Sequence, residues 1–178
     1  NMCNASPSAD TPPILIAMDA KIQTMRKNGV GRTIPMSKFN TGFKKIDLDK
    51  EEGELITEID VPELQKGEGS AYYKHAVRKA MDLAIIGVAA WVKMDGNKIA
   101  DCRIVIGGAA IMPVRSPAAE KLLIGQKFSD ELLEKAAEAT KNDIKPIADV
   151  RASAEYRTDM VRVFTKRSFK KALETLKA

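Results

Sequence analysis

Residues 84–107, AIIGVAAWVKMDGNKIADCRIVIG, decide the fold of this chain. The first nine are an unbroken apolar run, which is typical of a buried strand. The Asp95-Gly96 pair predicts a tight hairpin turn. In the second half, Ala100, Cys102, Ile104 and Ile106 fall on one face of a strand. The stretch therefore predicts an antiparallel hairpin at the centre of a sheet.

The flanking segments extend this hairpin into a domain. SAYYKHAV, from residue 70, alternates like a third strand. Three helical segments follow the hairpin: SPAAEKLLIG, then SDELLEKAAEATKND with Ser129 as its N-cap, and a long amphipathic helix after Ser153. Strands followed by helices predict an α+β fold.

The first third of the chain has its own pattern. TPPILIAMDA, from residue 11, has prolines at a helix start, and KIQTMRKNGVGRTIPM reads as two strands around an Asn28-Gly29 turn. GELITEIDVP then alternates. One face would carry Leu55, Thr57, Ile59 and Val61, and the other Glu54, Ile56, Glu58 and Asp60. Ile56 is apolar on the polar face, so we expect either protein or a ligand to cover it.

A boundary is expected near residues 62–69. Pro62 and the polar run after it interrupt both strand patterns. We therefore predict a first unit over 1–61, a linker over 62–69 and a second unit over 70–178.

Composition excludes several classes of function. The chain has 178 residues, 44% of them hydrophobic, without an apolar run long enough for a membrane span and without a signal pattern at its start. We therefore expect a cytoplasmic protein. The net charge of +5 is spread along the sequence and aromatics make up only 5%, which does not favour nucleic-acid binding.

The residues used most often in catalysis and metal binding are scarce. His75 is the only histidine and lacks a nucleophile at a meaningful spacing. Cys3 and Cys102 are too few for a disulfide framework or a zinc site, so both are interpreted as small buried hydrophobes. The sequence predicts neither a catalytic residue nor a metal site.

Two features leave alternatives open. NMCNASPSADTPP, residues 1–13, would make either a polar cradle for an anion or a helix entry capped by Asp10 or Thr11. Lys74 lies mid-strand, where a lysine either extends to solvent or holds an anionic partner.

The same opening segment resembles a flavin-contacting motif, Gly-Asn-x-x-x-x-Ser-Pro-x-x-Asp, of the FAD-binding medium subunit of the molybdenum hydroxylase family. This family includes xanthine dehydrogenases and aerobic carbon monoxide dehydrogenases. The similarity continues in order through FNTGFKKIDLDKEEGELITEI, SAYYKHAVRKAMDLAIIGVAA, RIVIGGAAIMPVRSPAAE and DVRASAEYR. Five ordered blocks are more specific than any one of them.

The resemblance implies a particular organisation. The chain would hold the last part of an FAD-binding α+β domain, without its earlier glycine-rich half. That remnant would be followed by the family's carboxy-terminal domain, a small antiparallel sheet with helices packed on one side.

The resemblance also implies site residues. Asp10 would contact FAD, Ile56 would touch the flavin, and Lys74 would reach the cofactor from the second unit. Asn1 and Ser6 belong to the motif and would contact FAD or shape its loop. Arg78 and Asp82 would form an ion pair near the flavin or at a subunit interface, whereas Lys93 has no counterpart among the flavin contacts.

The implied function is an FAD-carrying electron-transfer subunit of an oxidoreductase complex, inactive alone. Electrons would come from 2Fe-2S clusters on an iron–sulfur subunit, fed by molybdopterin on a large subunit, and would leave to NAD or another acceptor. The alternative is a non-enzymatic protein-interaction domain without a cofactor.

Overall fold

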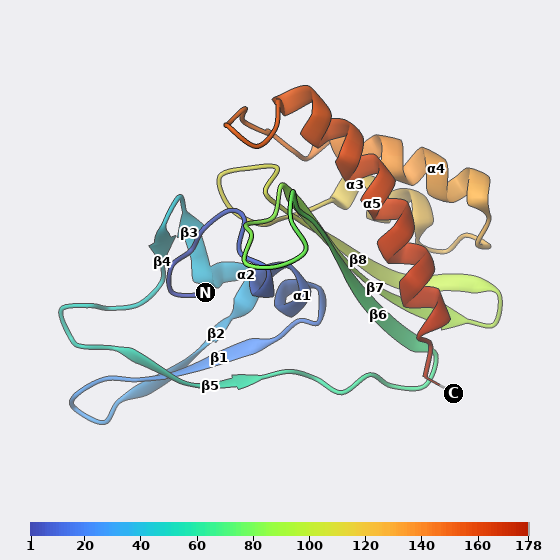
Figure 1. Cartoon of the computed structure of the whole chain (residues 1–178). Coiled ribbons are helices and arrows are strands. Elements are labelled where there is room, and N and C mark those ends of the chain that lie inside the picture. Colours follow the sequence, from blue (N-terminus) through green and yellow to red (C-terminus); the bar gives the residue numbers. More distant parts are fainter. Residues whose placement is uncertain (178) are drawn as a thin grey trace.

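The computed structural model describes residues 1–177 and contains both helices and antiparallel sheets (Figure 1). A four-stranded sheet has the order β6-β7-β8-β9, and a three-stranded sheet has the order β2-β1-β5. A short hairpin pairs β3, Asn40–Gly42, with β4, Lys45–Ile46. The predicted α+β class is confirmed.

The central hairpin forms the middle of the four-stranded sheet. Strand β7, Ile86–Asp95, pairs antiparallel with β8, Lys98–Gly107, through the turn at Gly96, whose φ is 56°. Strand β6, Glu68–His75, flanks β7, and β9, Val114–Arg115, flanks β8.

The helices predicted after the sheet cover one of its faces. They are α3, Pro117–Leu123, α4, Asp130–Ala139, and α5, Ala154–Glu174, with a short 3-10 turn at Thr140–Asn142. Ser129 is the expected N-cap of α4, since its Oγ accepts from Leu132 N at 3.1 Å. Ser153 caps α5 in the same way and accepts from Tyr156 N at 3.1 Å.

The sheet is buried on both faces. Val88, Ala90 and Val92 of β7 point into a hydrophobic cluster with the helices, while Ala89 and Trp91 belong to a second cluster with helix α1. The apolar run in β7 is therefore unbroken because neither face of the strand meets water.

The second cluster is formed mainly by the first third of the chain. Helix α1, Thr11–Ala17, is followed by β1, Lys21–Met25, β2, Gly31–Pro35, and the single helical turn α2, Met36–Phe39. Gly29 has a φ of 80° in the turn between β1 and β2, as the Asn28-Gly29 pair predicts.

The strict alternation expected for β5, Leu55–Asp60, is wrong. Ile56 lies opposite Thr24 and Ile59 opposite Ile22, with a register shift between Gln23 and Thr24. Residues directly opposite each other in an antiparallel pair share a face, so Ile56 and Ile59 are on the same side. A bulge at Thr57 inserts one residue and changes the phase of the strand. Protein covers Ile56 in part, because it packs against the second cluster.

A junction without helix or strand connects the two sheets. Strand β6 begins at Glu68, inside the range predicted as linker, and the division into two units stays a prediction; residue 178 lies outside the described residues. The segment after α5 returns to this junction. Gly67 N donates to Lys177 O at 2.8 Å, and Thr175 Oγ1 donates to Ser70 O at 3.0 Å. None of the helices within residues 1–177 has the length and apolar character to cross a membrane.

Candidate functional site

Asp10 and Lys74, two of the predicted site residues, meet in the structure. Asp10 stands at the start of α1, but its side chain makes no cap hydrogen bond. Its carboxylate instead accepts from Lys74 Nζ at 2.8 Å and from Tyr72 Oη at 3.1 Å. The capping alternative is therefore wrong for Asp10, and the anionic-partner alternative holds for Lys74.

Gly87 makes room for the Tyr72 side chain that contacts Asp10. A Cβ at Gly87 would meet Tyr72 Oη at 2.2 Å, so the tyrosine ring crosses a position that another residue would block. Tyr72 and Lys74 both lie on β6, two residues apart, and therefore point to the same face. Burial, then the charge of Asp10, raises the pKa of Tyr72, which keeps the phenol a hydrogen-bond donor.

Lys74 also holds the loop between β6 and β7. Its Nζ donates to Asp82 O at 2.6 Å. The side chain-to-side chain ion pair expected between Arg78 and Asp82 is not formed within residues 1–177. Asp82 Oδ2 accepts from Arg78 N at 2.9 Å, and Arg78 Nη2 donates to Met81 O. Both side chains are instead used within the loop, in which Met81 has a φ of 52°.

The other predicted site residues do not join the hydrogen bonds of Asp10 and Lys74. Ser6 Oγ accepts from Ser8 N at 3.3 Å, so Ser6 shapes the opening loop. Asn1 is exposed, and Ile56 packs with the second hydrophobic cluster on the side of β5 that faces the protein.

The burial expected of the two cysteines is observed for Cys102 but not for Cys3. His75 bonds Tyr156 Oη through Nε2 at 2.9 Å and stacks on Phe164. Burial, then Arg167, lowers its pKa. Cys102 is buried, which raises its pKa to about 12. Cys3 is exposed, because the opening loop lies on the surface rather than in a core. The described residues include no group of three or more His, Cys, Asp or Glu able to hold a metal ion.

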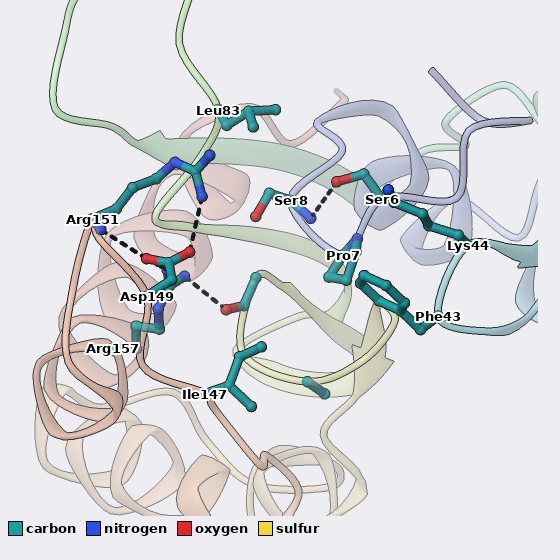
Figure 2. A pocket seen from close by; sticks show the side chains of 12 residues that line it. Ser6, Pro7, Ser8, Phe43, Lys44, Leu83, Ile147, Asp149, Arg151 and Arg157 are labelled. Atoms are coloured by element: carbon teal, nitrogen blue, oxygen red, sulfur yellow. Dashed lines mark hydrogen bonds and ion pairs between the residues drawn. The ribbon is translucent and has the colours of Figure 1, made fainter.

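A cavity of about 330 Å³ opens beside the opening loop (Figure 2). Its lining includes Ser6, Ser8, Phe43, Leu83, Ile147 and Arg151. Five separate segments of the chain supply this lining. The sequence did not predict the cavity, because no local pattern reports which loops meet.

The buried Arg157 is the residue that sequence reasoning missed most clearly. It is only 2% exposed, and its guanidinium donates to Ile85 O, to Gly108 O at 3.0 Å and to Asp149 Oδ1 at 2.8 Å. Arg157 belongs to the block DVRASAEYR, which resembles the family, and this could have indicated a special role. Its position in a basic amphipathic helix instead predicted a solvated side chain.

The residues present suit a flavin nucleotide. Lys74 has a third N–H beyond those donated to Asp10 and Asp82, and Asp10 offers an acceptor for hydroxyl groups. The opening loop turns through Ala5 with a φ of 44°. The buried side chain of Asn40 has no hydrogen-bond partner for either amide atom within the described residues. It lies on β3 of the β3–β4 hairpin, whose Lys44 N donates to Ala5 O of the opening loop.

Comparison with known proteins identifies the family of the chain. Residues 71–172 match the model of the CO dehydrogenase flavoprotein C-terminal domain, and residues 1–64 match that of the FAD binding domain in molybdopterin dehydrogenase. The glyceraldehyde dehydrogenase medium chain of Sulfolobus acidocaldarius is 36% identical over 167 residues, covering 94% of this chain and 58% of that protein.

A putative xanthine dehydrogenase FAD-binding subunit of Escherichia coli is 32% identical, covering 97% of this chain and 59% of that protein. The carbon monoxide dehydrogenase structure from Hydrogenophaga pseudoflava matches with a TM-score of 0.90 and 32% identity, over 97% of this chain and 59% of that chain. The chain thus spans less than two thirds of the length of these relatives. It belongs to the family of FAD-binding medium subunits of the molybdenum hydroxylases, and its own helices and sheets are those of the CO dehydrogenase flavoprotein.

Proposed function

We propose that this chain is the part of a dehydrogenase medium subunit that holds FAD between its two sheets and lets the cofactor carry electrons. The supporting observation is the contact of Asp10 with Lys74, at 2.8 Å. The pair joins a segment matched by the FAD-binding model to one matched by the flavoprotein C-terminal model. Residues 64 positions apart thus form one polar group that joins the two matched segments.

The residues would divide the work of binding. The Lys74 ammonium would attract negative charge on the cofactor, and the Asp10 carboxylate would accept from its hydroxyl groups. Ile56 would offer apolar surface to the ring, while Asn1 and Ser6 would hold the opening loop in shape. When bound, FAD itself supplies the redox chemistry, because it accepts and releases electrons and no side chain has to do so.

The other redox centres would belong to partner subunits. Two cysteines cannot ligate even one 2Fe-2S cluster with four thiolates, so the clusters would be on an iron–sulfur subunit and molybdopterin on a large subunit. NAD or another acceptor would then take electrons from the flavin, in the cytoplasm. The alternative of a docking domain without a cofactor is less well supported, because residues 1–64 match an FAD-binding model.

Replacing Lys74 tests the proposal. In the subunit expressed from its complete gene, Lys74→Ala should weaken FAD binding roughly ten- to a hundredfold, as expected for one lost charge-assisted contact. The free energy of unfolding should change by less than about 1 kcal/mol, since the Asp10–Lys74 pair is partly exposed. FAD titration by fluorescence and the reduction potential of the flavin are the measurements.

Lys98→Ala is the control. Lys98 is exposed and makes no ion pair within residues 1–177, whereas Lys93 is unsuitable because its Nζ lies 3.3 Å from Glu68. Equal affinity and equal potential for all three proteins would show that Lys74 does not touch the cofactor. A wild-type subunit that binds no FAD would contradict the proposed function itself.

A further inference from the structure

The guanidinium of Arg157 joins the ends of two neighbouring strands. Its Nη1 donates to Gly108 O at 3.0 Å, just after β8, and to Ile85 O, just before β7. Gly108 lies so close to Ile85 that a Cβ on the glycine would meet Ile85 O at 2.6 Å. Asp149 Oδ1 accepts from Nη2 at 2.8 Å (Figure 2). We call the contact of Arg157 with the two carbonyls the arginine clamp.

The Gly108 end of the arginine clamp is tied to the opening loop. Gly108 N donates to Pro7 O at 2.7 Å. Pro7 belongs to the short segment that leads to Asp10, and this segment is turned, because Ala9 N donates to Ser6 O at 3.0 Å. A movement of Gly108 would therefore be passed to Asp10 through a short, hydrogen-bonded turn.

The Ile85 end is tied to the loop between β6 and β7. Ile85 N donates to His75 O at 2.7 Å, which closes the base of this loop. Inside the loop, Asp82 O accepts from Lys74 Nζ at 2.6 Å. Lys74 and the arginine clamp therefore hold the same loop, each through one of its carbonyl groups.

The two connections meet at a single contact. Asp10 follows the segment held through Gly108, Lys74 binds the loop held through Ile85, and the ion pair between them measures 2.8 Å. Within the described residues, none of the hydrogen bonds of Arg157 goes to either side chain of this pair. Its effect on the pair therefore passes through the two backbone segments.

Stability alone is a weak reason for an arginine at this position. Arg157 is only 2% exposed, and its Nε has no hydrogen-bond partner in the part of the chain that the structure describes. Burying a guanidinium is costly, and an apolar side chain of similar volume often stabilises a protein as well or better. An apolar side chain cannot, however, hold two carbonyl groups from different segments with one rigid donor.

We propose that Arg157 is a positioning residue of the FAD site. It sets the separation of the opening loop and the β6–β7 loop, and thereby the placement of Asp10 and Lys74 toward the cofactor. This inference rests on the proposed function. A lysine would carry the same charge on a flexible stem, without the planar fork that fixes both carbonyls at once. The site therefore requires the shape of the guanidinium as well as its charge.

The test replaces Arg157 in the subunit expressed from its complete gene. Arg157→Lys and Arg157→Met should each raise the Kd of FAD about tenfold, the lower end of the loss expected when the Lys74 contact is removed. Both should also shift the reduction potential of the flavin. Without FAD, the amides of Gly108 and Ile85 should exchange hydrogen faster, since the arginine clamp no longer holds their segments.

A double-mutant cycle with Lys74→Ala asks whether Arg157 acts through the pair. In the Lys74→Ala protein, Arg157→Lys should raise the Kd of FAD by a smaller factor than it does in the wild type. The two losses should not multiply, because a misplaced lysine matters only where the lysine is present.

Ser168→Ala is the matched control. Ser168 lies on the same helix, is fully buried, and donates through Oγ to Val88 O at 2.8 Å. The variant therefore also removes a buried hydrogen bond between α5 and a carbonyl, but Val88 lies within β7 and in neither loop. Its stability should fall, whereas its Kd for FAD and its reduction potential should stay those of the wild type.

Several outcomes would overturn the inference. They are wild-type affinity and potential in folded Arg157→Lys protein, losses that multiply with that of Lys74→Ala, and an equal effect of Ser168→Ala. If Arg157→Met fails to fold, Arg157→Lys decides alone, and failure of both to fold would show a purely structural role. A wild-type subunit that binds no FAD would contradict the proposed function, and the inference with it.

Discussion

The two sheets of this molecule differ in how completely the chain covers them. The four-stranded sheet has helices α3, α4 and α5 on one face and α1 on the other (Figure 1). The three-stranded sheet faces the second cluster with Ile22 and Ile34, but Leu55 and Met25, which are opposite each other on its outer side, are 69% and 43% exposed.

This difference separates a region that is complete in itself from one that is not. In the four-stranded sheet the apolar residues of both faces find partners within residues 1–177. In the three-stranded sheet the outer face carries apolar side chains that meet solvent. We therefore expect the first region to determine the global stability and the second to open more easily.

Replacing either of two buried phenylalanines by alanine should destabilise a different region of the molecule. Phe169 stacks on Phe128 beneath the four-stranded sheet, and Phe39 lies in the second cluster; both are fully buried. Phe169→Ala should cost about 3–5 kcal/mol and lower the whole urea transition. Phe39→Ala, of similar local cost, should unfold the first third of the chain and leave β7 and β8 protected from hydrogen exchange.

Hydrogen exchange could also contradict the expected difference in stability between the two regions. If Phe39→Ala lowers protection equally in β7 and β8, the two regions unfold as one. Uniform strong protection of residues 1–61 in the wild type would likewise contradict the predicted division at 62–69.

Acid should distinguish the regions as well. Glu54 accepts from Arg32 Nε at 2.7 Å, and Arg32, more than any other group, lowers its pKa from 4.5 to about 2. The unfolded state then binds the proton more readily, so stability from Glu54 is present above pH 4.5 and lost as pH falls towards 2. Glu54→Gln should cost about 1–3 kcal/mol near neutral pH and abolish this dependence.

The four-stranded sheet should respond at higher pH. Burial lowers the pKa of His75 below its ordinary 6.5, so the folded state binds the proton less readily and stability falls as pH drops below that value. Site-resolved NMR from about pH 7 down to about pH 2 follows the unfolding of each region and checks both effects. A Glu54→Gln protein that keeps the wild-type acid profile in β1 and β5 would contradict the assignment.

The smallest effect concerns the contact between the regions. Tyr72→Phe removes the hydrogen bond to Asp10, at 3.1 Å, and should cost about 0.5–1.5 kcal/mol. Combined with Phe39→Ala, the loss should be less than the sum of the two, because the contact has no value once the first region is open. Strict additivity in a double-mutant cycle would indicate that the hydrogen bond does not couple the regions.

Local patterns predicted most of the elements but not their tertiary contacts. The central hairpin, the Asn28-Gly29 turn and the cap at Ser129 depend on neighbouring residues, and all were predicted. The phase of β5 was not, because a bulge is set by pairing with β1 and leaves no signature in an alternating sequence.

The candidate site shows the same limit. Asp10 is an excellent cap by residue type, yet its carboxylate bonds to Lys74, 64 positions away. Composition alone could not distinguish these two uses, and only the resemblance placed Asp10 and Lys74 at one cofactor. Arg157 was missed for the same reason, since the carbonyls that bury it come from the β7 and β8 ends.

The return of the segment after α5 to the start of β6 also orders events during synthesis. Ser70 accepts from Thr175, 105 residues later, and Gly69 leaves no room for a side chain under Ala172 O. A ribosome adds about 5–20 residues each second, so α5 is synthesised several seconds or more after the β6 strand that it covers. During that time the edge of β6 is available to any other strand. A nascent chain would therefore be most prone to mispairing in this interval, when the sheet has emerged and α5 has not.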